Sequence, residues 1–159
     1  MSRLDSVIRR LTAQREILND LATRLNGIPG LVLEFGLGNG RTFDHLRQHL
    51  PDRRIIVFES VVVEGLLSRP ASEDFVIGDI RDTASRFDDG CAALIHVDIE
   101  TGVAAEDAQL ATWLPGLVAR LLGPNGYAAS GAALDNPHLR PIALPAGIAS
   151  GRYHVVQRL

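Results

Sequence analysis

Hydrophobic residues recur at helical spacing through the first part of the chain, ahead of Gly27 and Pro29. Charged residues, most of them arginines, occupy the opposite face, and the glycine and proline supply a stop signal. The pattern predicts an amphipathic helix over Ser2–Asn26 that packs on a sheet or on a second subunit. Its apolar stripe comprises Leu4, Val7, Ile8, Leu11, Leu18, Leu21, Ala22 and Leu25.

Short apolar runs follow, and most of them alternate with helical segments. Strands are expected at Leu31–Phe35, Arg54–Phe58, Asp74–Ile77, Ala92–Val97, Gly126–Ser130, Arg140–Leu144 and Tyr153–Arg158. Helices are expected at Arg41–Leu50, Ile80–Phe87 and Ala104–Leu122, the last of which should bend or split at Pro115. This alternation predicts an α/β fold with a mostly parallel, seven-stranded sheet and helices on both faces. The last two strands have no clear helix between them, which indicates an antiparallel C-terminal hairpin at one sheet edge.

The composition is that of one globular domain spanning residues 1–159, with 46% hydrophobic and 22% charged residues. All 16 basic residues are arginines, which excludes lysine Schiff-base chemistry and a P-loop lysine. A net charge of −3 gives no nucleic-acid footprint. The single cysteine, the absence of an apolar run of membrane-spanning length and the lack of a signal pattern lead us to expect a cytoplasmic protein without membrane association.

A glycine-rich turn, Glu-Phe-Gly-Leu-Gly-Asn-Gly-Arg-Thr at residues 34–42, joins the first predicted strand to the next helix. A strand, a glycine turn and a helix N-terminus together suit a nucleotide-like ligand, because backbone amides face it without a Cβ in the way. We expect Glu34 to point into the ligand crevice, where a carboxylate repels pyrophosphate and attracts a cation. A dinucleotide fold would have a glycine where Arg41 stands, so a nicotinamide-dependent oxidoreductase is disfavoured.

Acidic residues also follow the next three predicted strands: Glu59, Asp79, and the pair Asp98 and Glu100. In an open α/β sheet, ligands bind at the carboxyl ends of the strands. Polar loops after strands are common in this class of protein. Acids at four consecutive strand ends, beside a glycine turn, favour a ligand site.

The segment from Glu34 to Gly40 resembles motif I of the class I methyltransferases that use S-adenosyl-L-methionine. The resemblance continues in motif order along nearly the whole chain. It implies that Glu59 binds both ribose hydroxyls, that Asp79 contacts the adenine amino group and that Asp98 lies beside the methyl-transfer position. Residues 121–126 resemble the turn before the family's fifth strand. The chain is also similar to a small, compact bacterial family described only as S-adenosyl-L-methionine methyltransferases.

The resemblance implies a Rossmann-like methyltransferase fold, with S-adenosyl-L-methionine as the cofactor. The expected cofactor-binding residues are Glu34, Gly36, Leu37, Gly38, Asn39, Gly40, Arg41, Thr42, Glu59, Ser60, Gly78, Asp79, Ile80 and Asp98. Arg41, Thr42 or the loop amides would hold the cofactor carboxylate, with Arg15 as an alternative if the first helix covers the cleft. Asp98 is the first candidate for a general base and Glu100 the second. The alternatives are that Asp98 only binds the cofactor and that Glu100 only caps the next turn.

The acceptor is predicted to be a small molecule. The signature of amino-methylating nucleic-acid enzymes is absent at residues 98–101, and the charge balance is acidic. The acceptor site is expected to come from the first helix, from the Ala132–Pro141 loop or from another subunit, which makes a homo-oligomer a reasonable expectation. A non-catalytic S-adenosylmethionine-binding sensor or subunit is the alternative function.

We expect no metal. Metal-dependent O-methyltransferases pair an aspartate like Asp98 with a later Asp-Asn, but here Asp135 and Asn136 lie further along and precede a proline. Asn-Pro is an ordinary turn signal, so a turn is the simpler interpretation. His96 alternates with Asp98 on the same strand, and a packed core histidine is the expected role there.

Overall fold

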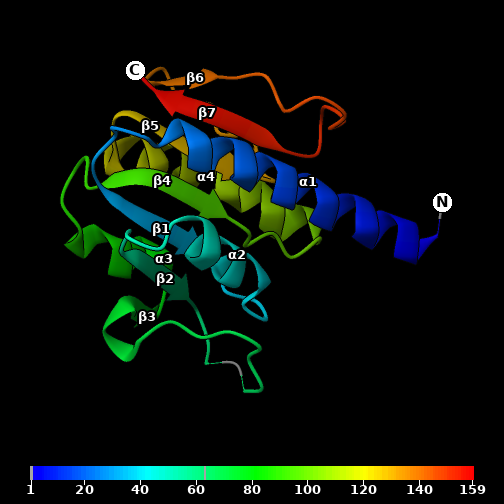
Figure 1. Cartoon of the computed structure of the whole chain (residues 1–159), viewed down its shortest axis with the longest axis horizontal. Helices are drawn as coiled ribbons and strands as arrows, with labels where there is room; N and C mark the ends of the chain where they lie inside the picture. The colour runs from blue at the N-terminus through cyan, green and yellow to red at the C-terminus, as the bar shows by residue number, and fades with distance from the viewer. Residues whose placement is uncertain (1, 63) are drawn as a thin grey trace.

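The computed structural model describes residues 2–62 and 64–159. Seven strands form one sheet in the order β3-β2-β1-β4-β5-β7-β6 (Figure 1). The strands are β1 (Leu31–Phe35), β2 (Ile55–Glu59), β3 (Phe75–Ile77), β4 (Ala92–Val97), β5 (Leu122–Ser130), β6 (Leu139–Pro141) and β7 (His154–Arg158). The helices are α1 (Arg3–Arg24), α2 (Arg41–His49), α3 (Ile80–Thr83) and α4 (Ala104–Leu121), with short 3-10 turns at Ser72–Asp74 and Ala84–Arg86.

Strands β1 to β5 are parallel to one another, and β7 runs antiparallel to both β5 and β6. This confirms the predicted mixed sheet with an antiparallel C-terminal hairpin. The strand order reverses at β1, which has β2 on one side and β4 on the other. The carboxyl ends of these three strands are therefore neighbours at the place where open α/β sheets bind ligands.

The central strands are mostly apolar because helices cover both faces of the sheet; Glu34 in β1 and His96 in β4 are buried polar exceptions. Val32 belongs to a buried cluster beneath α1 and α2, while Leu33, the next residue, belongs to the cluster beneath α3 and α4. Phe35 and Phe58 meet edge to face in the second cluster, with ring centroids 5.2 Å apart. Two packed layers thus hold the strand ends rigidly in place.

Helix α1 begins at a capping box, in which Ser2 and Asp5 exchange side-chain and backbone hydrogen bonds. Its predicted apolar stripe divides into two parts. Leu18 and Leu21 are buried against the sheet, whereas the residues of the first turns are exposed, where the helix runs past the strand ends (Figure 1). The predicted packing on the sheet therefore holds for the second half of α1 only.

Several predicted elements differ from the structure. The helix predicted over Ile80–Phe87 is α3 followed by a 3-10 turn, and β5 begins at Leu122 rather than at Gly126. Helix α4 continues through Pro115, where a split was among the expectations. A proline inside a helix costs about 3 kcal/mol, and the full burial of Leu114 and Val118 on either side offsets that cost. Strand β6 ends at Pro141 rather than at Leu144, after which only the amide of Ile142 still bonds to β7.

Residues 142–153, all within the described part of the chain, contain no helix and lead from β6 to β7. The absence of a helix there agrees with the prediction. Tyr153, at the end of this segment, donates a hydrogen bond to the carbonyl oxygen of Arg10 at 3.4 Å. The segment therefore meets α1. Every helix in the described residues is too short or too polar to cross a lipid bilayer.

Candidate active site

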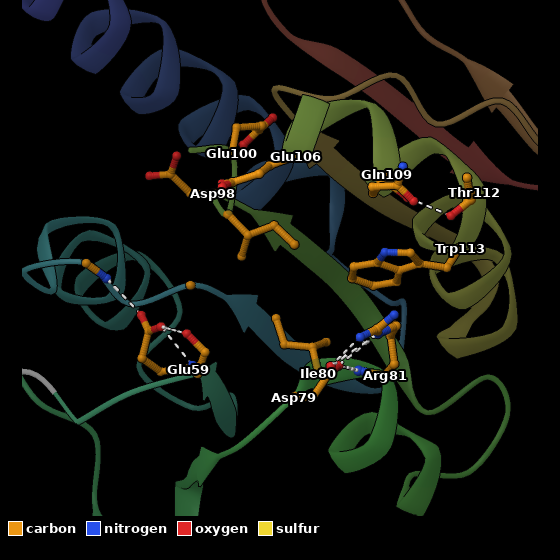
Figure 2. Close-up of a pocket in the computed structure, with 14 residues that line it drawn as sticks. Glu59, Asp79, Ile80, Arg81, Asp98, Glu100, Glu106, Gln109, Thr112 and Trp113 are labelled. Carbon is orange, nitrogen blue, oxygen red and sulfur yellow. Dashed lines mark hydrogen bonds and ion pairs between the residues drawn. The ribbon is translucent and has the colours of Figure 1, made fainter. Parts of the chain in front are cut away.

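The largest cavity lies at the carboxyl ends of β1 to β4 and has a volume of about 760 Å³. The loops after the strands supply most of its wall, and α4 supplies one side (Figure 2). Its lining consists of Gly36, Gly38, Glu59, Ser60, Asp79, Ile80, Arg81, Asp98, Ile99, Glu100, Glu106, Gln109, Thr112 and Trp113. The acids predicted at the second, third and fourth strand ends therefore do share one cavity.

Glu59 is fixed against the glycine turn. The amide of Leu37 donates to Glu59 Oε2 at 2.9 Å. The amide of Gly38 donates to the same oxygen at 3.4 Å, and the amide of Ser60 donates to Oε1 at 2.8 Å (Figure 2). These bonds hold the carboxylate at the cavity wall between β1 and β2. Two carboxylate oxygens in such a position suit the two hydroxyl donors of a vicinal diol.

All three glycines of the turn have left-handed backbone conformations, and the consequences differ between Gly36 and Gly38. A Cβ on Gly36 (φ 89°) would collide with the carbonyl oxygen of Asp98, so glycine lets the ends of β1 and β4 approach. A Cβ on Gly38 (φ 54°) would meet no atom within 4 Å and would stand in the cavity. Gly38 therefore leaves its backbone open to a ligand, as a nucleotide-like cofactor requires.

The far end of the cavity holds an ionic and aromatic group. Asp79 caps α3, and Arg81 binds its carboxylate at 2.5 Å (Figure 2). The hydrogen bonds from Arg81 lower the pKa of Asp79 to about 2, so this carboxylate is ionised at neutral pH. The Arg81 guanidinium also lies 5.8 Å from the ring centre of Trp113. This end offers a planar, partly aromatic surface next to a fixed negative charge.

The expectation that Glu34 points into the crevice is wrong. Its side chain is fully buried, and it lines none of the cavities found among the described residues. Strand alternation places Glu34 on the same face as Val32, beneath α1 and α2. There Glu34 Oε1 accepts a hydrogen bond from Thr42 and lies 3.2 Å from His96 Nδ1, whereas Oε2 has no partner in the described structure.

His96 is packed in the core, as predicted, and its ionisation is coupled to Glu34. Burial by itself would lower the pKa of His96, but the charge and the hydrogen bond of Glu34 outweigh burial and raise it. The pair joins β1 to β4 directly below the glycine turn, and Thr42 extends it to α2. Glu34 thus supports the turn from beneath.

Helix α1 approaches the end of β4 from the other side of the turn. Gln14 donates to Asp98 Oδ2 at 3.1 Å, and Arg10 Nη1 lies 3.9 Å from Asp98 Oδ1. A pocket of about 160 Å³ lies between α1 and the turn, and Arg41 and Thr42 also line it. Arg15, the alternative considered for the cofactor carboxylate, instead pairs with Glu16 on the exposed face of α1.

Glu100 occupies the boundary between the main cavity and a third pocket of about 360 Å³. Its Oε1 is buried without a hydrogen-bond partner in the described structure, and a Cβ on Gly131 would collide with the carboxylate. Burial raises the pKa of Glu100, and the charges of Asp98 and Asp107 raise it further. Glu100 does not cap the next turn, because Asp107 accepts the hydrogen bonds from the amides of residues 101 and 102.

Asp98 is the one described residue that lines all three of these spaces. The main cavity lies on one side of it, the small pocket under α1 on another, and the third pocket beyond. The strand end predicted to lie next to the reacting position is therefore the junction of the site.

Several residues that line these spaces were not predicted from the sequence. Glu106, Gln109 and Trp113 lie on one face of α4 at i, i+3 and i+7, and this spacing is the signal in the sequence for the side that faces the cavity. Arg10 and Gln14 likewise lie on one face of α1, at i and i+4. The predicted turn near Asp135 is present, with Asn136 Oδ1 accepting from the amide of His138 at 2.9 Å, and Asp135 lines a separate cavity.

The comparisons with known proteins agree with this geometry. A family model described as S-adenosyl-L-methionine methyltransferase matches residues 1–158. The chain belongs to this family. A solved S-adenosyl-L-methionine methyltransferase from Silicibacter pomeroyi DSS-3 is 34% identical, with a TM-score of 0.91 over 100% of this chain and 99% of that chain. This methyltransferase therefore uses S-adenosyl-L-methionine.

More distant solved structures share the fold. TrmN from Thermus thermophilus is 18% identical, with a TM-score of 0.62 over 89% of this chain and 48% of that one. The 1,6-didemethyltoxoflavin-N1-methyltransferase of Burkholderia thailandensis, solved with bound 1,6-didemethyltoxoflavin and S-adenosylhomocysteine, is 17% identical, with a TM-score of 0.54 over 92% of this chain and 78% of that one. No curated protein matches the sequence significantly.

Proposed function

We propose that this methyltransferase transfers the methyl group of S-adenosyl-L-methionine to a small molecule, with the cofactor lying across the glycine turn. The adenosine part would occupy the main cavity, where Glu59 faces the ribose hydroxyls and Asp79 and Ile80 lie beside the adenine. This placement is supported by the fixed carboxylate of Glu59, the bare backbone of Gly38 and the planar surface near Trp113.

The amino-acid end of the cofactor would occupy the pocket between α1 and the turn. Asp98, oriented by Gln14, would bind the ammonium group, and Arg41 with Thr42 would face the carboxylate. In this assignment the two ends of the cofactor lie on opposite sides of Asp98. The proposal rests on the observation that Asp98 lines the main cavity, the pocket under α1 and the third pocket. The sulfonium group of a cofactor bound beside Asp98 would therefore be open to an acceptor in the third pocket.

The bound cofactor supplies an already activated methyl group, so the protein needs mainly to position the acceptor and exclude water. Asp98 was the first candidate for a general base, but Gln14 and Arg10 already engage its carboxylate. Within the described residues, one buried oxygen of Glu100 has no hydrogen-bond partner, and burial raises the pKa of this carboxyl; both features suit a group that accepts a proton. We therefore assign the proton-accepting role to Glu100 and the cofactor-positioning role to Asp98.

The size of the third pocket supports a small acceptor. Its volume of about 360 Å³ lies near the lower end of the range for small-molecule sites. Two acids, Asp98 and Glu100, line it, and the chain carries a net charge of −3. Arg10 and Arg152 also line this pocket, but the net charge of −3 gives the chain no excess of positive charge for a nucleic acid.

Calorimetry with S-adenosylmethionine, S-adenosylhomocysteine and NAD tests the cofactor assignment: the first two should bind and NAD should not. Tight binding of NAD would overturn it. Asp98→Asn should weaken cofactor binding roughly tenfold or more, because it removes a charged hydrogen-bond partner. Asp52→Asn, at an exposed position, is the matched control and should leave the affinity unchanged.

Release of S-adenosylhomocysteine from pools of small molecules tests turnover. The proposal is supported if one pool causes release of S-adenosylhomocysteine and if Glu100→Gln abolishes this release while the cofactor still binds. If none of a broad set of pools causes release of S-adenosylhomocysteine, a non-catalytic S-adenosylmethionine-binding sensor or subunit is favoured instead.

We also propose that the protein forms a homo-oligomer through the first turns of α1. Leu4, Val7 and Ile8 are 67%, 43% and 54% exposed, and they form one apolar stripe beyond the sheet. Analytical ultracentrifugation of the wild type and of a Leu4→Ser, Ile8→Ser double variant tests this. A wild type that sediments as a monomer at micromolar concentration would refute it.

A further inference from the structure

The third pocket, called here the acceptor pocket, combines two acidic and two basic side chains. Its wall consists of Asp98 and Glu100 from the end of β4, Arg10 from α1, Arg152 and Tyr153 before β7, and residues 101, 102 and 131. The acids come from the sheet side, and the arginines come from α1 and the segment packed on it. A ligand that spans this pocket meets opposite charges on its two sides.

The arginines on the α1 side have no close acidic partner within the described residues. Five other arginines are paired with an acid at 2.5–2.8 Å, namely Arg15, Arg24, Arg54, Arg81 and Arg120. Within the described residues, Arg152 has no acidic partner, and its one hydrogen bond is to Ser6 Oγ at 3.5 Å. Arg10 has only the long contact with Asp98. Two guanidinium groups are therefore available to an anion.

A neighbouring pocket extends the positive surface. Arg9, Arg10 and Arg152 all line a space of about 180 Å³ next to the acceptor pocket. Tyr153 lies between the two pockets, is half-buried and bonds to the backbone of α1. This bond keeps Arg152 beside Arg10, although the two residues come from opposite ends of the chain. Guanidinium groups are well suited to carboxylate and phosphate, which they bind through paired hydrogen bonds.

The acidic side presents a different chemistry. Glu100 Oε1 is buried and unpartnered in the described structure, and the absence of a side chain at residue 131 leaves room for it. A buried oxygen without a partner costs free energy unless a ligand donor satisfies it. An O–H or N–H group of an acceptor would provide that donor.

We propose that the methyl acceptor is a small acid whose carboxylate or phosphate binds Arg152 and Arg10, and whose hydroxyl or amine donates to Glu100. This inference rests on the function proposed above and specifies its substrate class. In the transfer, a lone pair of the acceptor oxygen or nitrogen forms the bond to the methyl carbon. The sulfur–methyl bond breaks with its electrons going to sulfur, and Glu100 takes the acceptor proton. The products are the methylated acid and the thioether S-adenosylhomocysteine, so no further reactant is needed.

Matched pairs of acceptors test the proposal. Amino acids and hydroxy acids are compared with their neutral amides, and phosphate monoesters of amino alcohols with the free amino alcohols. Release of S-adenosylhomocysteine should occur with the acids and not with their neutral partners. The two sets distinguish a carboxylate from a phosphate. Equal turnover of an acid and its neutral partner would overturn the proposal.

Arg152→Gln isolates the anion contact, because Arg152 lines neither the main cavity nor the pocket under the glycine turn. The KM for the acid should rise roughly tenfold to a hundredfold, while the Kd for S-adenosylmethionine stays unchanged. Arg152→Lys should recover part of the loss. Arg86→Gln, at an exposed arginine that lines none of these pockets, is the control and should leave both constants unchanged. An unchanged KM in Arg152→Gln would refute the assignment.

The same pairs are titrated calorimetrically into protein loaded with S-adenosylhomocysteine, so that the result does not depend on turnover. Binding of an acid that is lost in Arg152→Gln supports anion recognition even if no product forms. Failure of every acid to bind, with the cofactor bound normally, overturns the inference while the cofactor assignment stands. Failure of the cofactor itself to bind overturns the proposed function.

Discussion

The two sides of Asp98 are built in different ways. On the side proposed to hold the cofactor, the acids lie at strand ends: Glu59 closes β2, and Asp79 follows β3. On the acceptor side, Arg10 comes from the first helix and Arg152 from the segment before the last strand. The cofactor side is thus encoded in short local motifs, whereas the acceptor side exists only after the two ends of the chain have packed together.

The two sides also differ in how far their charges are satisfied. Glu59 accepts hydrogen bonds from three backbone amides, and Asp79 is bound by Arg81. Glu100 has a buried oxygen with no partner among the described residues, and Arg152 has no acid beside it there. The cofactor side is held in place before any ligand binds, while the acceptor side has bonding capacity left over. Substitutions on the two sides should therefore change different constants.

Glu100→Gln should produce the largest effect. We expect kcat to fall by roughly 10² to 10⁴, the usual contribution of a positioned acid or base, with the cofactor Kd unchanged. Release of S-adenosylhomocysteine and calorimetry measure the two quantities. Glu73→Gln, an exposed residue in the 3-10 turn before β3, is the matched control. If kcat and cofactor affinity fell equally, Glu100 would contribute to cofactor binding as well, and the two sides of Asp98 would not act on different constants.

The pH profile of kcat is a second test of the proton-accepting role of Glu100. Burial raises the pKa of Glu100, and only the ionised form accepts a proton, so kcat should increase as the pH rises through this raised pKa. In Glu100→Gln this limb should disappear. The charged and titratable groups that share its surroundings are His96, Asp98, Asp107, Arg10, Arg152 and Tyr153. A limb that persists in the variant would belong to one of these.

Glu34→Ala should affect both sides at once, because Glu34 supports the glycine turn from beneath. Removing one partner of a buried pair leaves His96 without its acid, and such losses cost about 3–5 kcal/mol of unfolding free energy. Urea denaturation measures the change, with Glu73→Ala as the control. A variant as stable as the wild type would contradict the structural role assigned to Glu34.

The pair also sets a pH dependence of stability. The folded-state pKa of His96 is raised above its ordinary value of 6.5. The stabilising contribution is therefore fully present below pH 6.5 and is lost as the pH rises through the raised pKa. Glu34→Ala should abolish this part of the stability profile. A pH dependence that is the same in both proteins would assign it to another group.

The sequence predicted well which strand ends carry the acids of the main cavity, because local chemistry determines their positions. The bounds of β1 and β4 agree with the expected Leu31–Phe35 and Ala92–Val97, and the glycine turn follows β1 as predicted. The run of apolar residues in each strand requires burial on both faces, and the polar residue after it must lie at the strand end. No long-range information was needed for Glu59 or Asp79 to reach one cavity.

The errors have a common cause in long-range packing. Whether Glu34 faces the ligand or the core depends on which residue of β4 stands beside it, and the register pairs it with His96. The same holds for α1, whose stripe looks uniform in sequence but is buried only where the sheet lies beneath it. Arg152 carries no local signal at all, because its role follows from the contact between Tyr153 and α1.

Glu59→Ala tests the cofactor side alone. The variant loses the carboxylate that would bind the ribose hydroxyls, and the Kd for S-adenosylmethionine should rise roughly tenfold to a hundredfold. The KM for the acceptor at saturating cofactor should stay unchanged. Calorimetry and initial rates measure the two constants, with Glu73→Ala as the control. An unchanged Kd would mean that the hydroxyls are held elsewhere.

Ser2→Ala should produce the smallest effect, since it removes only the cap at the exposed start of α1. The first turn should open more often, and amide hydrogen exchange near residues 3–6 should accelerate roughly fivefold. Gln14 lies more than three turns further along the helix and is buried, so the cofactor Kd should not change. Arg10 lies nearer the cap, so the KM for the acceptor should rise slightly. This rise should be smaller than the roughly fivefold increase in the amide hydrogen-exchange rate. A loss of cofactor affinity would show that the start of α1 supports both sides of Asp98. The cofactor side and the acceptor side would then not be independent of each other at this helix.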